Sequence, residues 1–170
     1  TRAAFGFTAD ELTEFRESQL KYLSRWRPEA VVLAARWGRG YSSENIRGYI
    51  EYIAELGSNV IVLEQPPVLE SDNRNTPQYL AFLGFDPAQK KNFFLPALMD
   101  SGRESHREEV KKICEEQSAC TFLRIKDIYT AENDVLVMRE RDVLYIDDDH
   151  LSHSGARLAQ DRLDSVILQF

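Results

Sequence analysis

The stretch "AVVLAARW", residues 30 to 37, is apolar almost throughout and shows no alternation of apolar and polar residues. A run of this kind is typical of a strand buried on both faces, as the strands of a parallel sheet are. The stretch "NVIVLEQ", residues 59 to 65, repeats the pattern before Pro66, and "CTFLRI", residues 120 to 125, supplies a third such run. These stretches predict three strands of one parallel sheet.

Helical patterns flank these strands. The sequence "TADE", residues 8 to 11, is typical of a capping box, and the helix after it is expected to pack on one face. Ser43 is expected to cap a second helix that ends at Gly57. The expected inward residues are Leu12, Phe15, Tyr22, Leu23 and Trp26 in the first helix, and Ile46, Tyr49, Ile50 and Ile53 in the second.

The second half of the chain is less regular. Residues 68 to 100 predict an irregular, partly helical excursion, in which "NTPQYLAFLG" and "DPAQKKNFFLPALMD" each begin with a cap residue followed by proline, as short helices do. A charged helix over about 103 to 117, capped by Ser101, leads into the third strand. The stretches "DVLVM" and "DVLYI" predict a small hairpin or an extended pair around "RERD". A final helix follows Ser152, with apolar positions at Ala156, Leu158, Ala159, Leu163, Val166 and Ile167.

Alternating helices and buried strands indicate an α/β fold: a three-layer α/β/α sandwich with right-handed crossovers around a parallel sheet. In such sheets the ligand site lies beyond the carboxyl ends of the strands. Three segments follow extended runs there: "RWGRGYS" at 36 to 42, "EQPPVLESDN" at 64 to 73 and "IDDDHLS" at 146 to 152. We expect them to converge on one crevice.

Charge and hydropathy argue against nucleic-acid binding and against a membrane-spanning helix. The net charge is −7 and the lysines and arginines are scattered, which argues against binding nucleic acid. No apolar run approaches the roughly 20 residues of a membrane-spanning helix. The 170 residues fit a single domain, residues 1–170.

Cys114 and Cys120 match neither a zinc ribbon nor a redox motif, so a disulfide and two unpaired core thiols both remain open.

The segment "YIDDDHLSHSGA", residues 145 to 156, concentrates acidic residues and imidazoles. Asp147 and His150, three residues apart before a helix, could supply a base for acyl transfer and the carboxylate that orients it. Alone, Asp-x-x-His is a weak pattern, and an acidic turn before a helix capped by Ser152 or Ser154 explains it as well. Adjacent acids such as Asp148 and Asp149 cannot all point inward, so we expect no metal, and no cofactor. His106 and His153 are interpreted as exposed helix residues.

Three segments together resemble the SGNH/GDSL hydrolase superfamily. "YIDDDHLSHSGA" with the amphipathic helix after it resembles the last sequence block of that superfamily, "RPEAVVLAARW" resembles the strand of its third block, and "VIVLEQPPV" the following strand. The resemblance is greatest to the SGNH domains attached to type-three membrane acyltransferases, which add acyl groups to surface glycans. It runs from about residue 18 to residue 170 and implies a flavodoxin-like strand order.

The resemblance implies roles for five residues. His150 would be the general base and Asp147 its orienting carboxylate. Arg36 and Trp37 lie where simpler relatives have a Gly-x-Asn-Asp loop, so the oxyanion-binding Asn is lacking here. The Arg36 side chain or an amide of the "RWGRG" loop is a candidate substitute, with a salt-bridged Arg36 and a core Trp37 as alternatives. Gln65 is a candidate substrate contact, although hydrogen bonding to loop backbone is the favoured interpretation.

One part of the family pattern is missing. Members begin with a strand that ends in Gly-Asp-Ser and carries the nucleophilic serine, and this chain shows no such strand. Because a base without a nucleophile cannot run acyl transfer, we expect the chain alone to be inactive. We expect it to be the carboxyl-terminal part of its domain, opening at Thr1 after processing or trimming. The serine would lie on an amino-terminal segment or a separate chain, and "AVVLAA" would present an open sheet edge.

Two functions of different classes follow. The first is an O-acyltransferase or acyl esterase acting on surface glycans, with a Ser-His-Asp mechanism and acetyl as the expected group. Its partners would be a glycan acceptor, an acyl donor and a membrane acyltransferase domain, in a periplasmic or other extracytoplasmic location. The second is a non-catalytic carbohydrate-binding or assembly module with the same fold.

Overall fold

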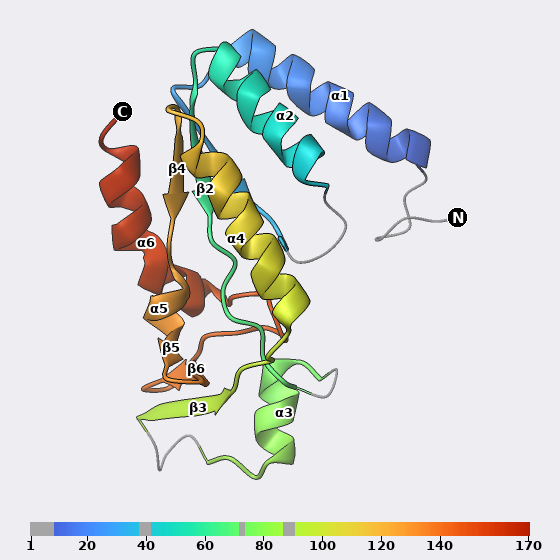
Figure 1. Ribbon diagram of the computed structural model, residues 1–170. Helices are drawn as coiled ribbons and strands as arrows, with labels where there is room; N and C mark the ends of the chain where they lie inside the picture. Colours follow the sequence, from blue (N-terminus) through green and yellow to red (C-terminus); the bar gives the residue numbers. More distant parts are fainter. Residues whose placement is uncertain (1–8, 38–41, 72–73, 87–90) are drawn as a thin grey trace.

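The computed structural model describes residues 9–37, 42–71, 74–86 and 91–170 (Figure 1). In chain order its elements are α1 (Ala9–Trp26), β1 (Ala30–Ala34), α2 (Ser43–Glu55), β2 (Asn59–Leu63), α3 (Thr76–Phe82), β3 (Asn92–Pro96), α4 (Ser101–Glu115), β4 (Cys120–Leu123), α5 (Lys126–Tyr129), β5 (Thr130–Ala131), β6 (Asp134–Arg139), β7 (Asp142–Val143) and α6 (His153–Ile167).

Strands β1, β2 and β4 form the predicted parallel sheet, in the order of the chain. Helices α1, α2 and α4 lie on one side of this sheet and α6 on the other, which confirms the α/β class (Figure 1). Among the described strands, β1 pairs only with β2, so it is an edge strand. The parallel sheet therefore ends at β1 within the described part of the chain. The predicted burial of this strand on both faces is wrong, since Val32 is 40% exposed.

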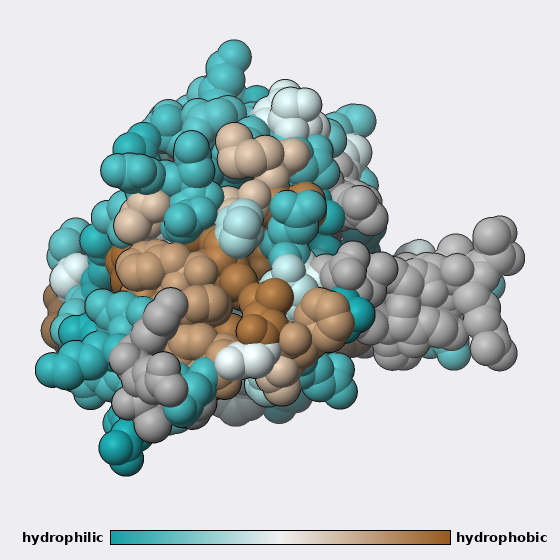
Figure 2. Space-filling view, turned by 90° about the horizontal axis from the view of Figure 1, so that it is seen from below, coloured by the Kyte–Doolittle hydropathy of each residue, from teal (hydrophilic) through white to brown (hydrophobic). Residues whose placement is uncertain are grey.

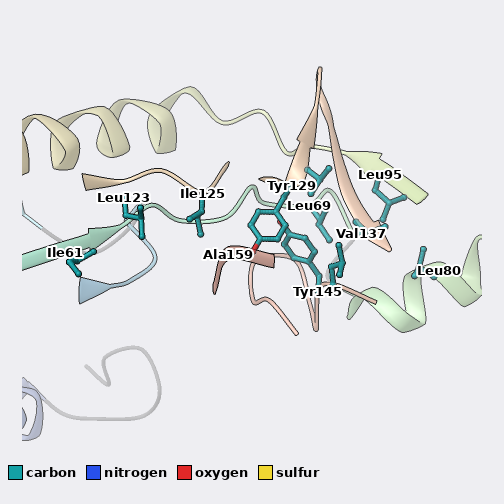
Figure 3. Close-up of a cluster of buried hydrophobic side chains, with 12 residues drawn as sticks. Ile61, Leu69, Leu80, Leu95, Leu123, Ile125, Tyr129, Val137, Tyr145 and Ala159 are labelled. Atoms are coloured by element: carbon teal, nitrogen blue, oxygen red, sulfur yellow. The ribbon is translucent and has the colours of Figure 1, made fainter. Parts of the chain in front are cut away.

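The central strand β2 separates two apolar cores. Val60 and Val62 pack with α2 and α4, whereas Ile61 between them faces α6 and the second sheet, because successive side chains of a strand point to opposite faces. All three are fully buried, and each such burial stabilises the fold by about 1.5–3 kcal/mol. Figure 3 shows the second core, where the rings of Tyr129 and Tyr145 lie side by side.

A second, antiparallel sheet forms the end of the molecule opposite to α1 (Figure 1). Its order is β3-β6-β5, and β7 pairs with β6 as the predicted hairpin. The helical interpretation of "DPAQKKNFFLPALMD" is wrong for residues 92–96, which form β3. Leu95 lies opposite Val135 of β6 and is buried. Pairing with a distant strand and the two adjacent phenylalanines outweighed the local cap signal.

The predicted short helix at "NTPQYLAFLG" is confirmed as α3. The Asn75 side chain accepts the backbone N–H of Gln78, and proline stands in the first turn. Two other caps lie one residue earlier than predicted: Ser42 rather than Ser43 caps α2, and Asp100 rather than Ser101 caps α4. Each of these side chains accepts an otherwise unpaired N–H of the first turn.

Helix α1 is not packed as predicted. Leu23 is half-buried against the α2 side of the sheet, but Phe15, Tyr22 and Trp26 are each more than 60% exposed. Periodicity identifies the apolar side of a helix but does not supply the element that covers it. Thr8 of the predicted capping box and the side chain of Leu12 lie outside the described residues.

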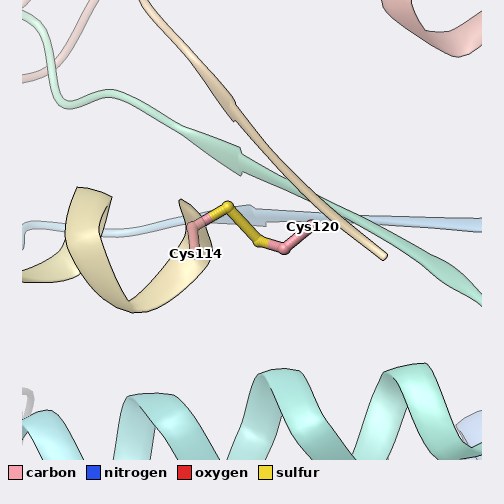
Figure 4. The surroundings of a disulfide bond; sticks show 2 residues. All are labelled: Cys114 and Cys120. Atoms are coloured by element: carbon pink, nitrogen blue, oxygen red, sulfur yellow. A yellow bond between two sulfur atoms is a disulfide. The ribbon is translucent and has the colours of Figure 1, made fainter. Parts of the chain in front are cut away.

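Cys114 and Cys120 form a disulfide, so the open question of their state is answered (Figure 4). The bond joins the last turn of α4 to the first residue of β4. Cys114 is fully buried among the apolar residues between the sheet and α2. The turn between α4 and β4 is therefore closed covalently as well as by packing.

The surface carries apolar residues at the end opposite to α1. Figure 2 looks at the molecule from that end and shows apolar atoms gathered within a hydrophilic surround. The exposed apolar residues at the end of α3, in β3 and in the segment after β3 are Phe82, Leu83, Phe94, Leu98 and Met99. No helix among the described residues is both long and apolar enough to cross a membrane.

Candidate active site

The acidic segment forms a closed turn between β7 and α6. The N–H of Ile146 donates to the carbonyl of His150 (2.8 Å), and the N–H of Ser152 donates to the carbonyl of Leu144 (2.8 Å). These bonds place Asp147, Asp148 and Asp149 at the tip of the turn. A turn closed in this way holds the side chains at its tip in fixed relative positions.

Asp147 and His150 meet inside this turn. The ring nitrogen Nδ1 of His150 lies 2.9 Å from Oδ2 and 3.0 Å from Oδ1 of Asp147. Oδ1 also accepts the backbone N–H groups of Asp149 (3.1 Å) and His150 (2.8 Å). We assign the proton to Nδ1, because that nitrogen faces acceptors, which leaves Nε2 as the basic nitrogen. The His150 side chain is 66% exposed.

Asp149 is a second partner of the imidazole that the sequence interpretation missed. Its Oδ1 lies 3.1 Å from Nδ1 of His150, and its side chain is buried. Its other oxygen contacts Nε of Arg36, whose Nη2 lies 3.5 Å from Oδ2 of Asp148. Arg36, which follows β1, is therefore salt-bridged, one of the two alternatives for this residue. Because its partners belong to the turn, it ties the carboxyl end of the parallel sheet to His150.

The two carboxylates around His150 differ in their titration. Burial opposes ionisation of Asp147, but hydrogen bonds from the amides of Asp149 and His150 and from the ring outweigh it, so the pKa of Asp147 is lowered. Burial, reinforced by the charge of Asp148, raises the pKa of Asp149 despite Arg36 and His150. Asp147 is thus the carboxylate held ionised beside the ring.

Trp37 and Gln65 are both buried. Trp37 donates its ring N–H to the carbonyl of Leu63 (2.8 Å) and packs with α2, as the core interpretation expects. The side-chain oxygen of Gln65 accepts no hydrogen bond within the described residues, so the favoured bond to loop backbone is not formed by this atom. The rest of the "RWGRG" loop, residues 38–41, lies outside the described residues.

The three predicted strand-end segments do meet at this turn. Arg36 reaches it from β1, and the N–H of Leu69, after β2, donates to the carbonyl of Asp148 (2.7 Å). A separate cavity of about 500 Å³ lies beyond β4, between α4 and α6. Its lining excludes the turn and contains ion pairs such as Arg162–Asp127 and Arg107–Glu104. The imidazole therefore stands at an open rim and not in that cavity.

Gly155 fixes the start of α6 against the end of the hairpin. A Cβ at this position would lie 2.0 Å from the carbonyl oxygen of Leu144. Ser152 caps the helix by accepting the N–H of Gly155 (3.0 Å) and donates its hydroxyl to the carbonyl of Val143 (2.6 Å). Gly155 of the predicted block thus serves packing, and only its close approach to Leu144 shows why glycine is needed there.

Ligand atoms of Asp147, Asp149 and His150 lie within 4.8 Å of one another, as a metal site requires. Each of these atoms already has a partner, however. The Asp147 oxygens accept N–H groups, Asp149 pairs with Arg36, and Nδ1 of His150 faces both carboxylates. The arrangement is that of a hydrogen-bonded acid–base pair, in which the ring nitrogen that can act is the outward-facing Nε2.

Other hydroxyl and histidine side chains do not complete the site. In the described part of the chain, no serine, threonine or cysteine side chain hydrogen-bonds to the ring of His150. His153 is exposed at the start of α6, and His106 is exposed on α4 beside Glu109, as expected for both. The described residues thus contain an imidazole hydrogen-bonded to a carboxylate, without a hydroxyl group bonded to the ring.

A family model described as "SGNH domain (fused to AT3 domains)" matches residues 4–165, nearly the whole chain. The match includes β1, β2 and the turn that holds Asp147 and His150. No curated protein matches the chain.

Proposed function

This chain belongs to the family of SGNH domains that are fused to AT3 domains, and we propose that it provides the base of an O-acyltransferase or acyl esterase acting on surface glycans. An SGNH domain indicates hydrolase-like or acyltransferase-like chemistry. The observation that carries the finer proposal is the position of His150 at the carboxyl edge of the sheet. Its Nδ1 lies 2.9 Å from Asp147 and 3.1 Å from Asp149, and its side chain is 66% exposed.

In the proposed reaction His150 acts through Nε2. It takes the proton of a serine hydroxyl while the serine oxygen bonds to the acyl carbon of the donor, and it then returns that proton to the leaving group. In the second half it takes a proton from water or from a sugar hydroxyl, which attacks the acyl-serine, and returns the proton to the serine oxygen. Asp147 holds the ring in the required tautomer and stabilises its charged form.

The serine is proposed to come from outside residues 1–170. None of the described hydroxyl groups hydrogen-bonds to His150, and among the described strands β1 has one unpaired edge, where a further parallel strand could pair. Arg36 is already engaged by Asp148 and Asp149. We therefore favour backbone amides over the Arg36 guanidinium as donors to the oxyanion.

The proposed acyl group is acetyl, and its proposed source is a membrane AT3 domain. The proposed location is an extracytoplasmic compartment. The Cys114–Cys120 disulfide supports that location, because structural disulfides persist in oxidising compartments. Water as the acceptor would make the protein an esterase, and a glycan hydroxyl would make it a transferase.

The test compares His150→Ala with His153→Ala in the complete protein. Loss of the base should lower the rate of acetyl-ester cleavage or of acetyl transfer to glycan by about 10³-fold or more, while the circular dichroism spectrum stays unchanged. His153, three residues away and exposed, is the matched control and should leave the rate within twofold. Wild-type rates in His150→Ala would exclude the proposed role of His150, whereas a complete protein without ester cleavage or acetyl transfer would favour a non-catalytic binding module.

A further inference from the structure

Three successive carbonyl groups of the turn between β7 and α6 accept hydrogen bonds from Leu69 and Thr76. The N–H of Thr76 donates to the carbonyl of Ile146 (3.0 Å), and its hydroxyl donates to the carbonyl of Asp147 (2.8 Å). The N–H of Leu69 donates to the carbonyl of Asp148 (2.7 Å). Two of these three donors belong to a single residue, Thr76.

The environment of Thr76 makes these bonds consequential. Thr76 is fully buried, so water cannot replace its hydroxyl without rearrangement. It is the first residue of α3, where the Asn75 cap and Pro77 define the start of the helix. Both donors of Thr76 therefore lie at the start of a helix, and α3 supports the turn.

The bonds of Thr76 act on the residue that orients the imidazole. The carbonyl and the carboxylate of Asp147 share one Cα, so holding the carbonyl limits where the carboxylate can lie. That carboxylate sets the position of Nδ1 in His150 and hence the direction of Nε2. A small displacement of Asp147 would be transmitted to the basic nitrogen.

We propose that Thr76 is a positioning residue for the His150 base, which it fixes through the carbonyl groups of Ile146 and Asp147. The proposal rests on the function proposed above, in which His150 transfers the proton. The bond to the Ile146 carbonyl comes from the backbone N–H, which any residue other than proline supplies. The part of the role specific to threonine is therefore the bond from its hydroxyl to the Asp147 carbonyl.

The experiment compares Thr76→Val, which loses the hydroxyl at nearly constant shape, with Thr76→Ser, which keeps it. In the complete protein, Thr76→Val should lower kcat for cleavage of a chromogenic acetyl ester by about 10- to 100-fold with KM nearly unchanged. The ring ¹⁵N signals of His150 should shift, which reports a changed tautomer population or hydrogen bond. Thr76→Ser should restore both the rate and the ring signals.

Thr130→Val is the matched control, because Thr130 also donates its hydroxyl to a backbone carbonyl, that of Lys126 (3.1 Å). It should change neither the rate nor the ring signals. The proposal is wrong if folded Thr76→Val keeps the ring signals and the kcat of the wild type. It is also wrong if Thr76→Ser loses as much activity as Thr76→Val. If Thr76→Val does not fold, Thr76→Ala is measured with the same criteria. If the wild type cleaves no ester, the proposed function fails, and the ring signals still decide whether Thr76 positions His150.

Discussion

At the scale of single residues, two aspartates separated by one position have different roles. Asp147 accepts two backbone N–H groups, and this stabilises its ionised form, whereas the buried Asp149 lies beside Asp148 and is harder to ionise. Environments that push the pKa values of neighbouring acids apart are typical of sites in which each acid has its own task. Here one carboxylate orients the ring, and the other joins the ring to Arg36.

The lowered pKa of Asp147 predicts a pH-dependent contribution to stability. Because the pKa is lower in the folded state than the roughly 3.9 of an unfolded chain, this contribution is complete above about pH 5 and disappears as the pH falls through the folded value. Asp147→Asn should therefore unfold more easily than the wild type at pH 7, by no more than about 1 kcal/mol since the carboxylate is partly exposed. The difference should shrink below pH 4 in urea titrations.

Asp148→Asn is the control for this pH effect. In the described part of the chain, its side chain contacts Arg36 at 3.5 Å and accepts no backbone N–H. Because the charge of Asp148 opposes ionisation of Asp149, its removal should not destabilise the protein at pH 7 as Asp147→Asn does. A difference between the wild type and Asp147→Asn that grows as the pH falls would contradict the assignment.

At the scale of elements, the position of the turn depends on how closely α6 approaches the end of β7. Gly155 permits that approach, because any side chain there would meet the Leu144 carbonyl. Gly155→Ala should therefore displace the start of α6 and destabilise the protein by about 3 kcal/mol, at the upper end of overpacking effects. Equilibrium urea unfolding measures the change.

Gly48→Ala provides the matched comparison for this substitution. Gly48 lies in α2, and a Cβ there would meet nothing within 4 Å. Alanine should stabilise the protein at this position by about 0.5–1 kcal/mol, since glycine loses more backbone entropy in a helix. Equal effects of the two substitutions would show that the contact with Leu144 does not govern the packing of α6.

The elements also show where local patterns failed. The cap signal before residues 92–96 predicted a helix, yet these residues form a strand that pairs with β6. The apolar side of α1 is clear from its spacing, yet Phe15, Tyr22 and Trp26 stay exposed in the described structure. The partner of residues 92–96 is remote in the sequence, and no described element covers these side chains of α1, so local propensity could report neither outcome.

At the scale of the whole molecule, the disulfide ties the α4 side of the fold to the parallel sheet. Cys114 and Cys120 are 6 residues apart, and closing so short a loop should stabilise the fold by about 2 kcal/mol. Replacing both cysteines with alanine should lower the Tm by about 4–8 °C. Differential scanning calorimetry checks this value. Dithiothreitol should lower the Tm of the wild type alone, and an equal effect on the double variant would contradict the assigned bond.

The sequence by itself determined the strands and the spacing of the acid–base pair. The three strands are recognisable as apolar runs, although only β2 is buried on both faces. Asp147 and His150 meet because one tight turn brings positions three apart together. The matching segments also identified the family. These features are local: the interacting groups are neighbours along the chain, so the residues themselves report them.

Only the tertiary structure decided what surrounds that pair. Arg36 reaches Asp148 across 112 positions and Thr76 reaches Asp147 across 71. Such contacts depend on how the elements pack and on the direction in which each strand ends, and many sequences with the same local pattern would pack differently. The imidazole is therefore encoded locally, whereas the residues that hold it in place come together only when the sheet and its helices assemble.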